Sequence, residues 1–237
     1  MNIVIDCGNT KIKAATFFGD RLEKKYSFDN KERLQSFLGE NSYINSIVSS
    51  VSIPSDEISS WIQAEKKFLL TPQVPLPIKV LYKTPNSLGV DRVASACGAI
   101  GFFPNADCLV IDSGTCVNYE FVDRHSNYWG GAISPGIAMR FEAMHTFTKR
   151  LPLVSAATEK LIGDTTESCM RSGVMNGILM EVEGFINSYR LKYPELRVIL
   201  CGGDYTFFEN NLKPPIFAAP DLVLSGLNRI LLHNAAL

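Results

Sequence analysis

The segment IVIDCGNT, residues 3–10, decides the fold, because a close copy of it, LVIDSGT, recurs at residues 109–115. Each copy has three apolar residues followed by Asp, a small residue, Gly and then a hydroxyl or amide residue. The two acids, Asp6 and Asp112, lie 106 residues apart. One strand that ends in Asp before a glycine turn could arise by chance. Here further strand-like segments and then a helix follow both copies, so the repeat predicts two related α/β halves.

The hydrophobic pattern predicts the elements of each half. Strands are expected at residues 2–6, 12–18, 22–28, 44–49, 108–112, 116–122, 127–133 and 197–201. Helices are expected at residues 30–39, 55–66, 87–103, 135–149, 166–192 and 221–235. Four prolines within residues 71–86 predict an extended connector, because proline disfavours both its own and the preceding residue's helical conformation. We expect one half to span residues 1–104 and the other to span residues 105–237.

The composition excludes several classes of function. The chain has 237 residues, a formal net charge of −1 and a pI of about 6.3, so it lacks the basic excess of a nucleic-acid-binding protein. It has no apolar run long enough to span a membrane and no signal-peptide pattern at its start. The six cysteines form no Cys-x-x-Cys pair, which favours free thiols in a reducing compartment. We therefore expect a cytoplasmic protein that binds neither nucleic acid nor membrane.

The turn after the first strand combines residues that bind phosphate with an acid that would repel it. Gly8, Asn9 and Thr10 offer backbone N–H groups and a hydroxyl, and Lys11 and Lys13 offer positive charge. A carboxylate ahead of them is explained if a nucleotide arrives with Mg²⁺, since the cation bridges carboxylate and phosphate oxygens. The motif is not a Walker A loop, because GxxxxGK[ST] is absent and a strand follows the turn.

Several motifs in order along the chain resemble the type III pantothenate kinases, a family within the actin, sugar kinase and Hsp70 ATPase superfamily. They are DCGNTKIK at 6–13, LGVDR at 88–92, DSGTCVNY at 112–119, GGAISPG at 130–136, LP at 151–152, IGDTT at 162–166, SGVMNG at 172–177 and CGGD at 201–204. The resemblance implies an α/β fold with two similar ribonuclease H-like halves. Each half would be a mixed sheet flanked by helices, and the two would face each other across a nucleotide cleft.

The resemblance implies an enzyme, a kinase that uses ATP to phosphorylate pantothenate to 4'-phosphopantothenate in the first step of coenzyme A biosynthesis. Asp91 would be the catalytic base. The implied substrate-binding residues are Tyr82, Gly89, Val90, Asp91, Arg92 and Thr166. The implied ATP-binding residues are Asp6, Cys7, Gly8, Asn9, Thr10, Lys11, Ile12, Lys13 and Thr115.

The family also implies cations and a quaternary state. Asp112 would hold a monovalent cation, K⁺ or NH₄⁺, and Asp6 would act on the Mg²⁺ of ATP indirectly. The protein would be a homodimer. At the second turn, Cys116 and Asn118 replace the Ala and Thr that are usual in the family.

Other interpretations remain open at this point. The glycines at 130–131, 136 and 202–203 can be ordinary turn residues or positions where backbone approaches a ligand closely. Asp91 and Arg92 can be a helix-start acid and a solvated arginine, and Asp112 can be a turn acid. As a whole, the chain can also be a catalytically impaired relative that acts as a transcriptional accessory protein, or an actin-like filament protein.

Overall fold

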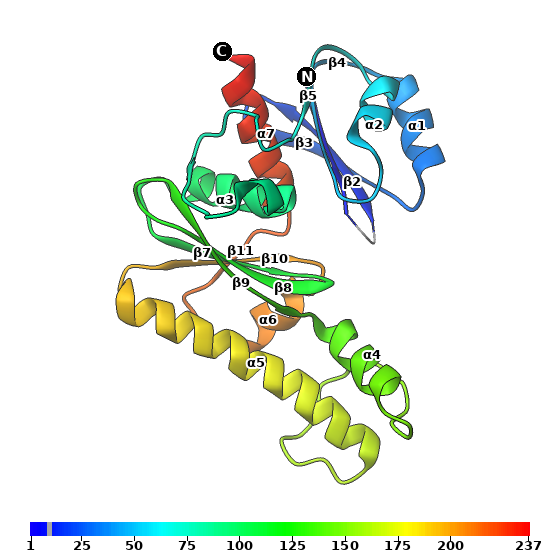
Figure 1. Cartoon of the computed structure of the whole chain (residues 1–237), viewed down its shortest axis with the longest axis vertical. Coiled ribbons are helices and arrows are strands. Elements are labelled where there is room, and N and C mark those ends of the chain that lie inside the picture. The colour runs from blue at the N-terminus through cyan, green and yellow to red at the C-terminus, as the bar shows by residue number, and fades with distance from the viewer. Residues whose placement is uncertain (9–10) are drawn as a thin grey trace. The chain divides into compact units, whose positions relative to one another are not determined.

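The computed structural model describes residues 1–8 and 11–237 and has the predicted α/β architecture (Figure 1). The chain divides into two compact units. Unit 1 consists of Met1–Asn105, Val122–Gly130 and Asp221–Leu237, and unit 2 consists of Ala106–Phe121 and Gly131–Pro220. Within the described part of the chain, no helix combines the length and the apolar character needed to cross a membrane.

The first sheet has five strands in the order β3-β2-β1-β4-β5. The strands are β1 (Asn2–Cys7), β2 (Ile12–Phe18), β3 (Arg21–Phe28), β4 (Ser42–Ser50) and β5 (Gln63–Leu69). The first three strands form an antiparallel meander, and β4 and β5 add to it in parallel, so the sheet is mixed. The predicted repeat segment IVID is its central strand, buried because the sheet is covered on both faces.

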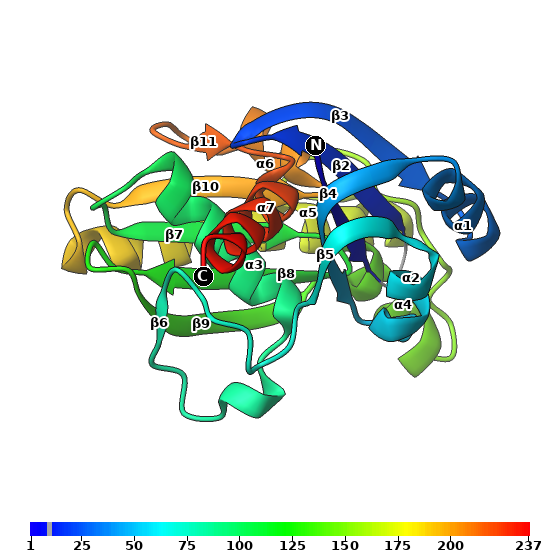
Figure 2. The same cartoon turned by 90° about the horizontal axis from the view of Figure 1, so that it is seen from above.

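Alternate residues of β1 face different helices. Ile3, Ile5 and Cys7 join the hydrophobic core that also contains residues of α1 (Lys31–Gly39) and α2 (Ser55–Trp61). The helix α7 (Leu222–Ala235) packs against β1, β2 and β4, and against α3 (Val90–Phe102). The two helices lie side by side in both views (Figures 1 and 2). They can approach closely because residue 98 is glycine. A Cβ there would lie only 2.5 Å from the carbonyl oxygen of Leu222.

The second sheet has six strands in the order β11-β10-β7-β8-β9-β6. The strands are β6 (Lys79–Val80), β7 (Cys108–Ser113), β8 (Cys116–Val122), β9 (Asn127–Pro135), β10 (Arg197–Gly202) and β11 (Phe217–Ala218). Its helices in unit 2 are α4 (Ile137–Phe147), α5 (Thr166–Lys192) and α6 (Tyr205–Asn211). A core of apolar side chains from β7, β8, β10 and these helices holds unit 2 together.

The largest departure from the sequence prediction falls at residues 55–66. The predicted helix there is wrong beyond Trp61, because the chain turns into β5 at Gln63. Gln, Glu and Lys in this segment are good helix formers, yet β5 gains parallel backbone pairing with β4, and that tertiary pairing overrides local preference. The prediction also missed α6 and the two-residue strands β6 and β11, which are too short to show a period.

Candidate active site

The turn after β1 is held by the segment that follows the neighbouring strand β4. The Gly8 N–H donates to the Lys11 carbonyl at 3.2 Å, which closes the turn. The Ser52 hydroxyl donates to the Gly8 carbonyl at 3.0 Å, and the Val51 N–H donates to the Cys7 carbonyl at 3.0 Å. Of the residues predicted to bind ATP here, Asn9 and Thr10 lie outside the described residues.

The residues on either side of this turn differ in exposure. Asp6 lies opposite Lys13 in the register of β1 and β2 and is half-buried, as Lys13 is. Lys11 is exposed, and Ile12 is buried. Burial, followed by the charge of Asp6, raises the pKa of the Cys7 thiol to about 12 and outweighs the opposing hydrogen bond with Ser50. Cys7 is therefore a protonated thiol at neutral pH and supports the turn as a small buried side chain.

Asp91 and Arg92 lie at the start of α3. Gly89 is the residue ahead of the helix, and Asp91 is in its first turn, where the helix dipole favours an acid. The Asp91 Oδ1 accepts a hydrogen bond from the Arg92 N–H at 2.9 Å. The Asp91 side chain is only half-buried, whereas Arg92 is 9% exposed. A carboxylate fixed in this way remains accessible to a ligand.

Tyr82 lies against Arg92. The Arg92 guanidinium carbon is 5.6 Å from the centroid of the Tyr82 ring, and the Tyr128 ring lies 6.4 Å from the Tyr82 ring. The chain reaches this position because β6 pairs with β9 and the Leu81 N–H donates to the Tyr128 carbonyl at 2.9 Å. Gly130 has φ of +92°, and a Cβ there would lie 2.7 Å from Tyr82 Cδ2. Unit 1 thus contains five of the six predicted substrate-binding residues, Tyr82 and Gly89 to Arg92.

The second acid turn, in unit 2, follows β7. Asp112 is half-buried near the end of the strand, and Thr115 is exposed in the turn before β8. The Gly136 N–H donates to the Thr115 carbonyl at 3.0 Å. A Cβ at Gly136 would lie 2.6 Å from the same oxygen. Glycine at this position therefore lets the start of α4 approach the turn.

The end of β10 borders the same turn. Gly202 has φ of +89°, and a Cβ there would lie 2.5 Å from Asp112 Oδ1. The Asp204 N–H donates to the Ser113 carbonyl at 3.0 Å. Burial raises the pKa of the Asp204 carboxyl above its ordinary value. The motifs that end at Gly136 and at Asp204 therefore meet at the turn that carries Asp112.

The Asp112 carboxylate is the kind of oxygen ligand that a hard cation takes. Across residues 1–8 and 11–237, no group of three or more His, Cys, Asp and Glu side chains is arranged to hold a metal ion. A cation at Asp112 would therefore need further oxygens from backbone, water or nucleotide.

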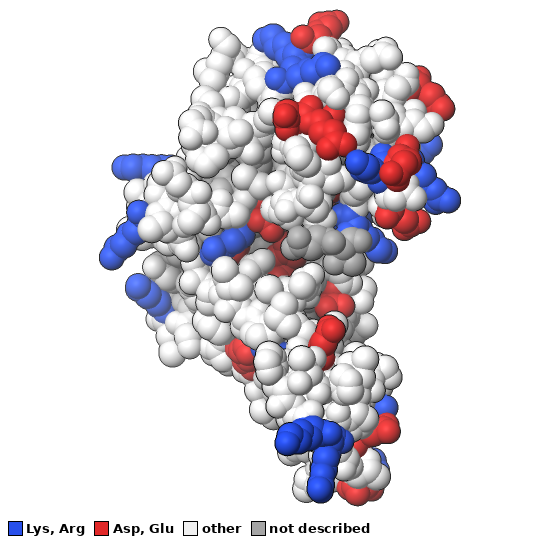
Figure 3. All heavy atoms as spheres, turned by 45° about the vertical axis from the view of Figure 1, so that its right-hand side comes forward, with Lys and Arg blue, Asp and Glu red and all other residues white. Residues whose placement is uncertain are grey.

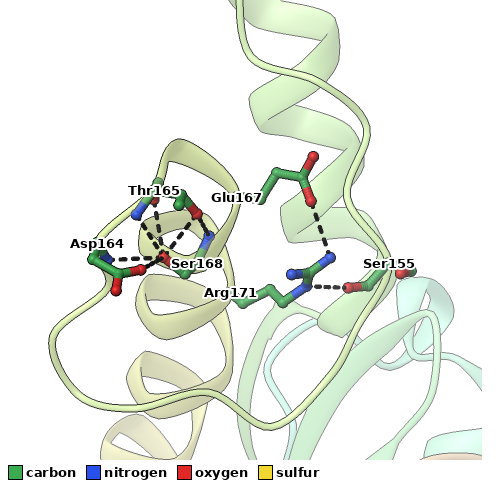
Figure 4. Close-up of polar contacts among 6 residues, drawn as sticks. All are labelled: Ser155, Asp164, Thr165, Glu167, Ser168 and Arg171. Atoms are coloured by element: carbon green, nitrogen blue, oxygen red, sulfur yellow. Dashed lines mark hydrogen bonds and ion pairs between the residues drawn. The ribbon is translucent and has the colours of Figure 1, made fainter.

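Thr166 is the first residue of α5 in unit 2. The Thr165 and Ser168 side chains form a capping box there, with the Ser168 N–H donating to Thr165 Oγ1 at 3.1 Å (Figure 4). Thr166 is exposed and lines a surface hollow of about 540 Å³. The hollow is also lined by Met144, Leu151, Gly163, Asp164, Thr165, Cys169 and Met170. Thr166 therefore lies in a different unit from Tyr82, Asp91 and Arg92.

Comparison with known proteins identifies the family. The model of the type III pantothenate kinase family matches residues 2–188. A type III pantothenate kinase of Cytophaga hutchinsonii is 41% identical, and the match covers 99% of this chain and 100% of the relative. One from Christiangramia forsetii is 43% identical, with 99% of each chain covered.

A solved structure assigned to the Baf family of transcriptional activators, from Campylobacter jejuni, covers 99% of this chain and 100% of its own at a TM-score of 0.65. Its 22% identity shows the shared fold alone. On the family model and the relatives together, the chain belongs to the type III pantothenate kinase family.

Proposed function

We propose that the protein transfers the γ-phosphoryl group of ATP to the hydroxyl of pantothenate and so forms 4'-phosphopantothenate, the first step of coenzyme A biosynthesis. The observation that carries this proposal is the 41% identity to a type III pantothenate kinase over essentially the whole of both chains. The family is defined by a kinase activity, so ATP with Mg²⁺ is the phosphoryl donor.

In this proposal Asp91 is the general base. Phosphoryl transfer to an alcohol needs an in-line hydroxyl and a group that accepts its proton. The Asp91 carboxylate suits this role because it is held by one backbone N–H and remains half-exposed. Loss of the proton to Asp91 leaves the substrate oxygen free to form the new P–O bond as the bond to ADP breaks.

Arg92 and Tyr82 would bind the acceptor, with Gly89, Val90 and Thr166. Pantothenate carries a carboxylate, and a guanidinium is the side chain best suited to bind one. The ring of Tyr82 restricts where the Arg92 guanidinium can lie, since the two groups are in contact. Binding by an oriented cation would restrict the positions that the acceptor can take at this site.

Residues of each acid turn have a proposed role toward ATP. Residues 6–13 and Thr115 would contact the phosphates, with Asp6 acting on the Mg²⁺ of ATP indirectly. Asp112 would hold a monovalent cation, K⁺ or NH₄⁺. When bound, these cations would neutralise charge on the phosphates, so that neither carboxylate faces phosphate directly.

We further propose that the protein is a homodimer in the cytoplasm, where its ATP would be found. Unit 2 exposes large apolar side chains of a kind that association would bury. They are Ile133, Met139, Phe147, Leu153, Leu161, Ile162 and Met180. Figure 3 shows that much of the surface around α4 is uncharged, with charged side chains at its lower end. Sedimentation of the wild type and of Phe147→Asp tests this, with loss of dimer expected in the variant.

The transcriptional accessory role is not favoured. The chain retains Asp6, Asp91, Arg92 and Asp112, the residues whose loss would accompany lost catalysis. The likeness to the Campylobacter jejuni protein extends to the fold alone.

A coupled assay of ADP release, with ATP, Mg²⁺ and pantothenate in the presence and absence of K⁺, tests the proposed function. We expect ADP release that requires pantothenate and K⁺, with 4'-phosphopantothenate identified by mass. No activity in any combination would overturn the kinase proposal. Activity that ignores K⁺ would overturn only the role given to Asp112.

A further inference from the structure

Glu181, near the middle of α5, accepts hydrogen bonds from three side chains of other elements. Its Oε1 accepts from the Tyr119 hydroxyl at 3.1 Å and from the Ser134 hydroxyl at 2.5 Å. Its Oε2 accepts from Arg140 Nη2 at 2.6 Å. The charged groups of this ion pair are partly buried, with the Arg140 and Glu181 side chains 20% and 26% exposed. We call Tyr119, Ser134, Arg140 and Glu181 the positioning network.

These hydrogen-bond donors stabilise the ionised form of the Glu181 carboxyl. Burial alone would raise the pKa of its carboxyl, but the hydrogen bonds from Arg140, Ser134 and Tyr119, with the charge of Arg140, lower it below its ordinary value. Glu181 is therefore ionised at neutral pH. Charge-assisted hydrogen bonds are stronger than neutral ones, so the ion pair holds the Arg140 side chain in one orientation.

Arg140 connects this ion pair to the backbone ahead of α4. Its Nε donates to the Pro135 carbonyl at 2.8 Å, while its Nη2 reaches Glu181. The Arg140 N–H also donates to the Gly136 carbonyl at 3.1 Å as part of the first turn of the helix. The side chain and the backbone of one residue thus hold both Pro135 and Gly136.

Gly136 in turn contacts the second acid turn. Its N–H donates to the Thr115 carbonyl at 3.0 Å, and the two backbones lie too close for any Cβ at position 136. A shift of Gly136 therefore has to move Thr115. None of the residues predicted to bind ATP belongs to the network.

We propose that Arg140 and Glu181 are positioning residues for the nucleotide, acting through Pro135 and Gly136 on the turn that carries Thr115. This inference rests on the proposed function, in which that turn binds ATP. Misplacement of a binding group weakens binding at that group, and Thr115 is predicted to contact ATP and not pantothenate. Loss of the network should therefore weaken ATP binding specifically.

The chain offers a matched control in Arg171 on α5. Its Nε donates to the Ser155 carbonyl at 3.2 Å and its Nη2 to Glu167 Oε2 at 3.2 Å (Figure 4). Arg171 thus resembles Arg140 in donating to a carbonyl and to a glutamate, whereas Arg140 also donates to Ser134 Oγ at 3.3 Å. No contact of Arg171 with Thr115 is found among the described residues. Any general effect of removing such an arginine appears in Arg171→Ala as well.

The test is calorimetric titration of the whole protein with Mg²⁺-ATP, alongside steady-state kinetics. We expect Arg140→Ala to raise the Kd and the KM for ATP about tenfold, with the KM for pantothenate within about twofold of wild type. Arg171→Ala should leave the Kd for ATP unchanged. Equal ATP affinity in Arg140→Ala, Arg171→Ala and wild type would overturn the inference.

A second variant keeps the test decisive if Arg140→Ala does not fold. Glu181→Gln retains the shape of the side chain and an acceptor for Ser134 and Tyr119, but loses the charge that orients Arg140. It should also raise the Kd for ATP. If the wild type binds ATP and these variants bind it weakly, yet pantothenate is not phosphorylated, the proposed function fails and the positioning role stands. If pantothenate is phosphorylated and ATP affinity is unchanged in both variants, the positioning role fails alone.

Discussion

The guanidinium of Arg92 lies over the ring of Tyr82, with its central carbon 5.6 Å from the ring centroid. Arg92 comes from the first turn of α3, and Tyr82 comes from the extended segment after β6. A cation over an aromatic face is stabilised by about 0.5–1 kcal/mol where solvent has access and by more where it does not. The orientation of Arg92 therefore depends on a residue outside its own helix.

Replacing Tyr82 should affect the acceptor substrate. We expect Tyr82→Ala to raise the KM for pantothenate about fivefold or more, because Arg92 loses the ring that orients it. Tyr82→Phe keeps the ring and should change that KM less. Steady-state kinetics with ATP held at saturation measures both values. Equal effects of the two substitutions would show that the ring does not orient Arg92.

Asp91→Asn separates chemistry from folding. The amide oxygen of Asn can still accept the hydrogen bond from the Arg92 N–H, so the free energy of unfolding should stay near the wild-type value. The amide cannot accept the substrate proton, so kcat should fall about 10²- to 10⁴-fold. Phosphopantothenate formation at a near wild-type rate would refute the role of Asp91 as base.

Substitutions of Gly202 and Gly203 test how closely the end of β10 packs against the second acid turn. In Gly202→Ala the new Cβ meets Asp112 Oδ1 and the Ser113 carbonyl at a positive φ. We expect a loss of about 1–3 kcal/mol in the free energy of unfolding, together with weaker activity. Gly203→Ala is the control, because its Cβ would meet no atom within 4 Å. Urea denaturation of the two variants compares them, and equal stability would contradict the prediction.

Thiol reactivity should follow burial. Burial raises the pKa of Cys7 and of Cys108 to about 12, with added contributions from Asp6 and Asp107. These thiols stay protonated and covered at pH 8, whereas Cys169 is exposed. We expect a thiol-specific reagent to modify Cys169 first, and Cys169→Ser to remove the fast phase. Peptide mass analysis that finds Cys7 modified first in the folded protein would contradict this.

Glu181 should make the free energy of unfolding decrease at acid pH. Its pKa in the folded protein lies below its ordinary value of 4.5, because hydrogen bonds outweigh the effect of burial. As the pH falls below about 4.5, Glu181 of the unfolded chain takes up a proton before Glu181 of the folded protein does. The free energy of unfolding therefore decreases. Glu181→Gln should reduce this dependence in urea denaturation curves between pH 6 and 3. An unchanged dependence would show that Glu181 does not contribute to it.

Much of the fold was predictable from local pattern. The segments IVID and LVID are strands, and the helix expected at residues 166–192 spans Thr166–Lys192. The two strands are continuous apolar runs that end at an acid, and the helix begins at the Thr165 cap. The segment from Gln63 to Leu69 has neither, and only its pairing with β4 makes it a strand. Local preference carries no information about such a partner.

In the candidate site, too, only features that lie within one short stretch of sequence were predictable. Asp91 and Arg92 are neighbours in the chain, and a short motif contains both. The contact of Tyr82 with Gly130 and the ion pair of Arg140 with Glu181 join segments that are far apart in sequence. A single sequence contains no pattern that pairs them, because the pairing depends on how β9, α4 and α5 pack.

The packing of α7 against α3 and β1 has a consequence for synthesis of the chain. Residues 1–105 emerge from the ribosome well before residues 222–235, which form the helix that covers one face of their sheet. All of unit 2 is translated in between. The strand β1 and the helix α7 are therefore folding partners, although the whole of unit 2 lies between them in the chain. Unit 1 therefore keeps an apolar surface uncovered until residues 222–235 have been translated, after the whole of unit 2.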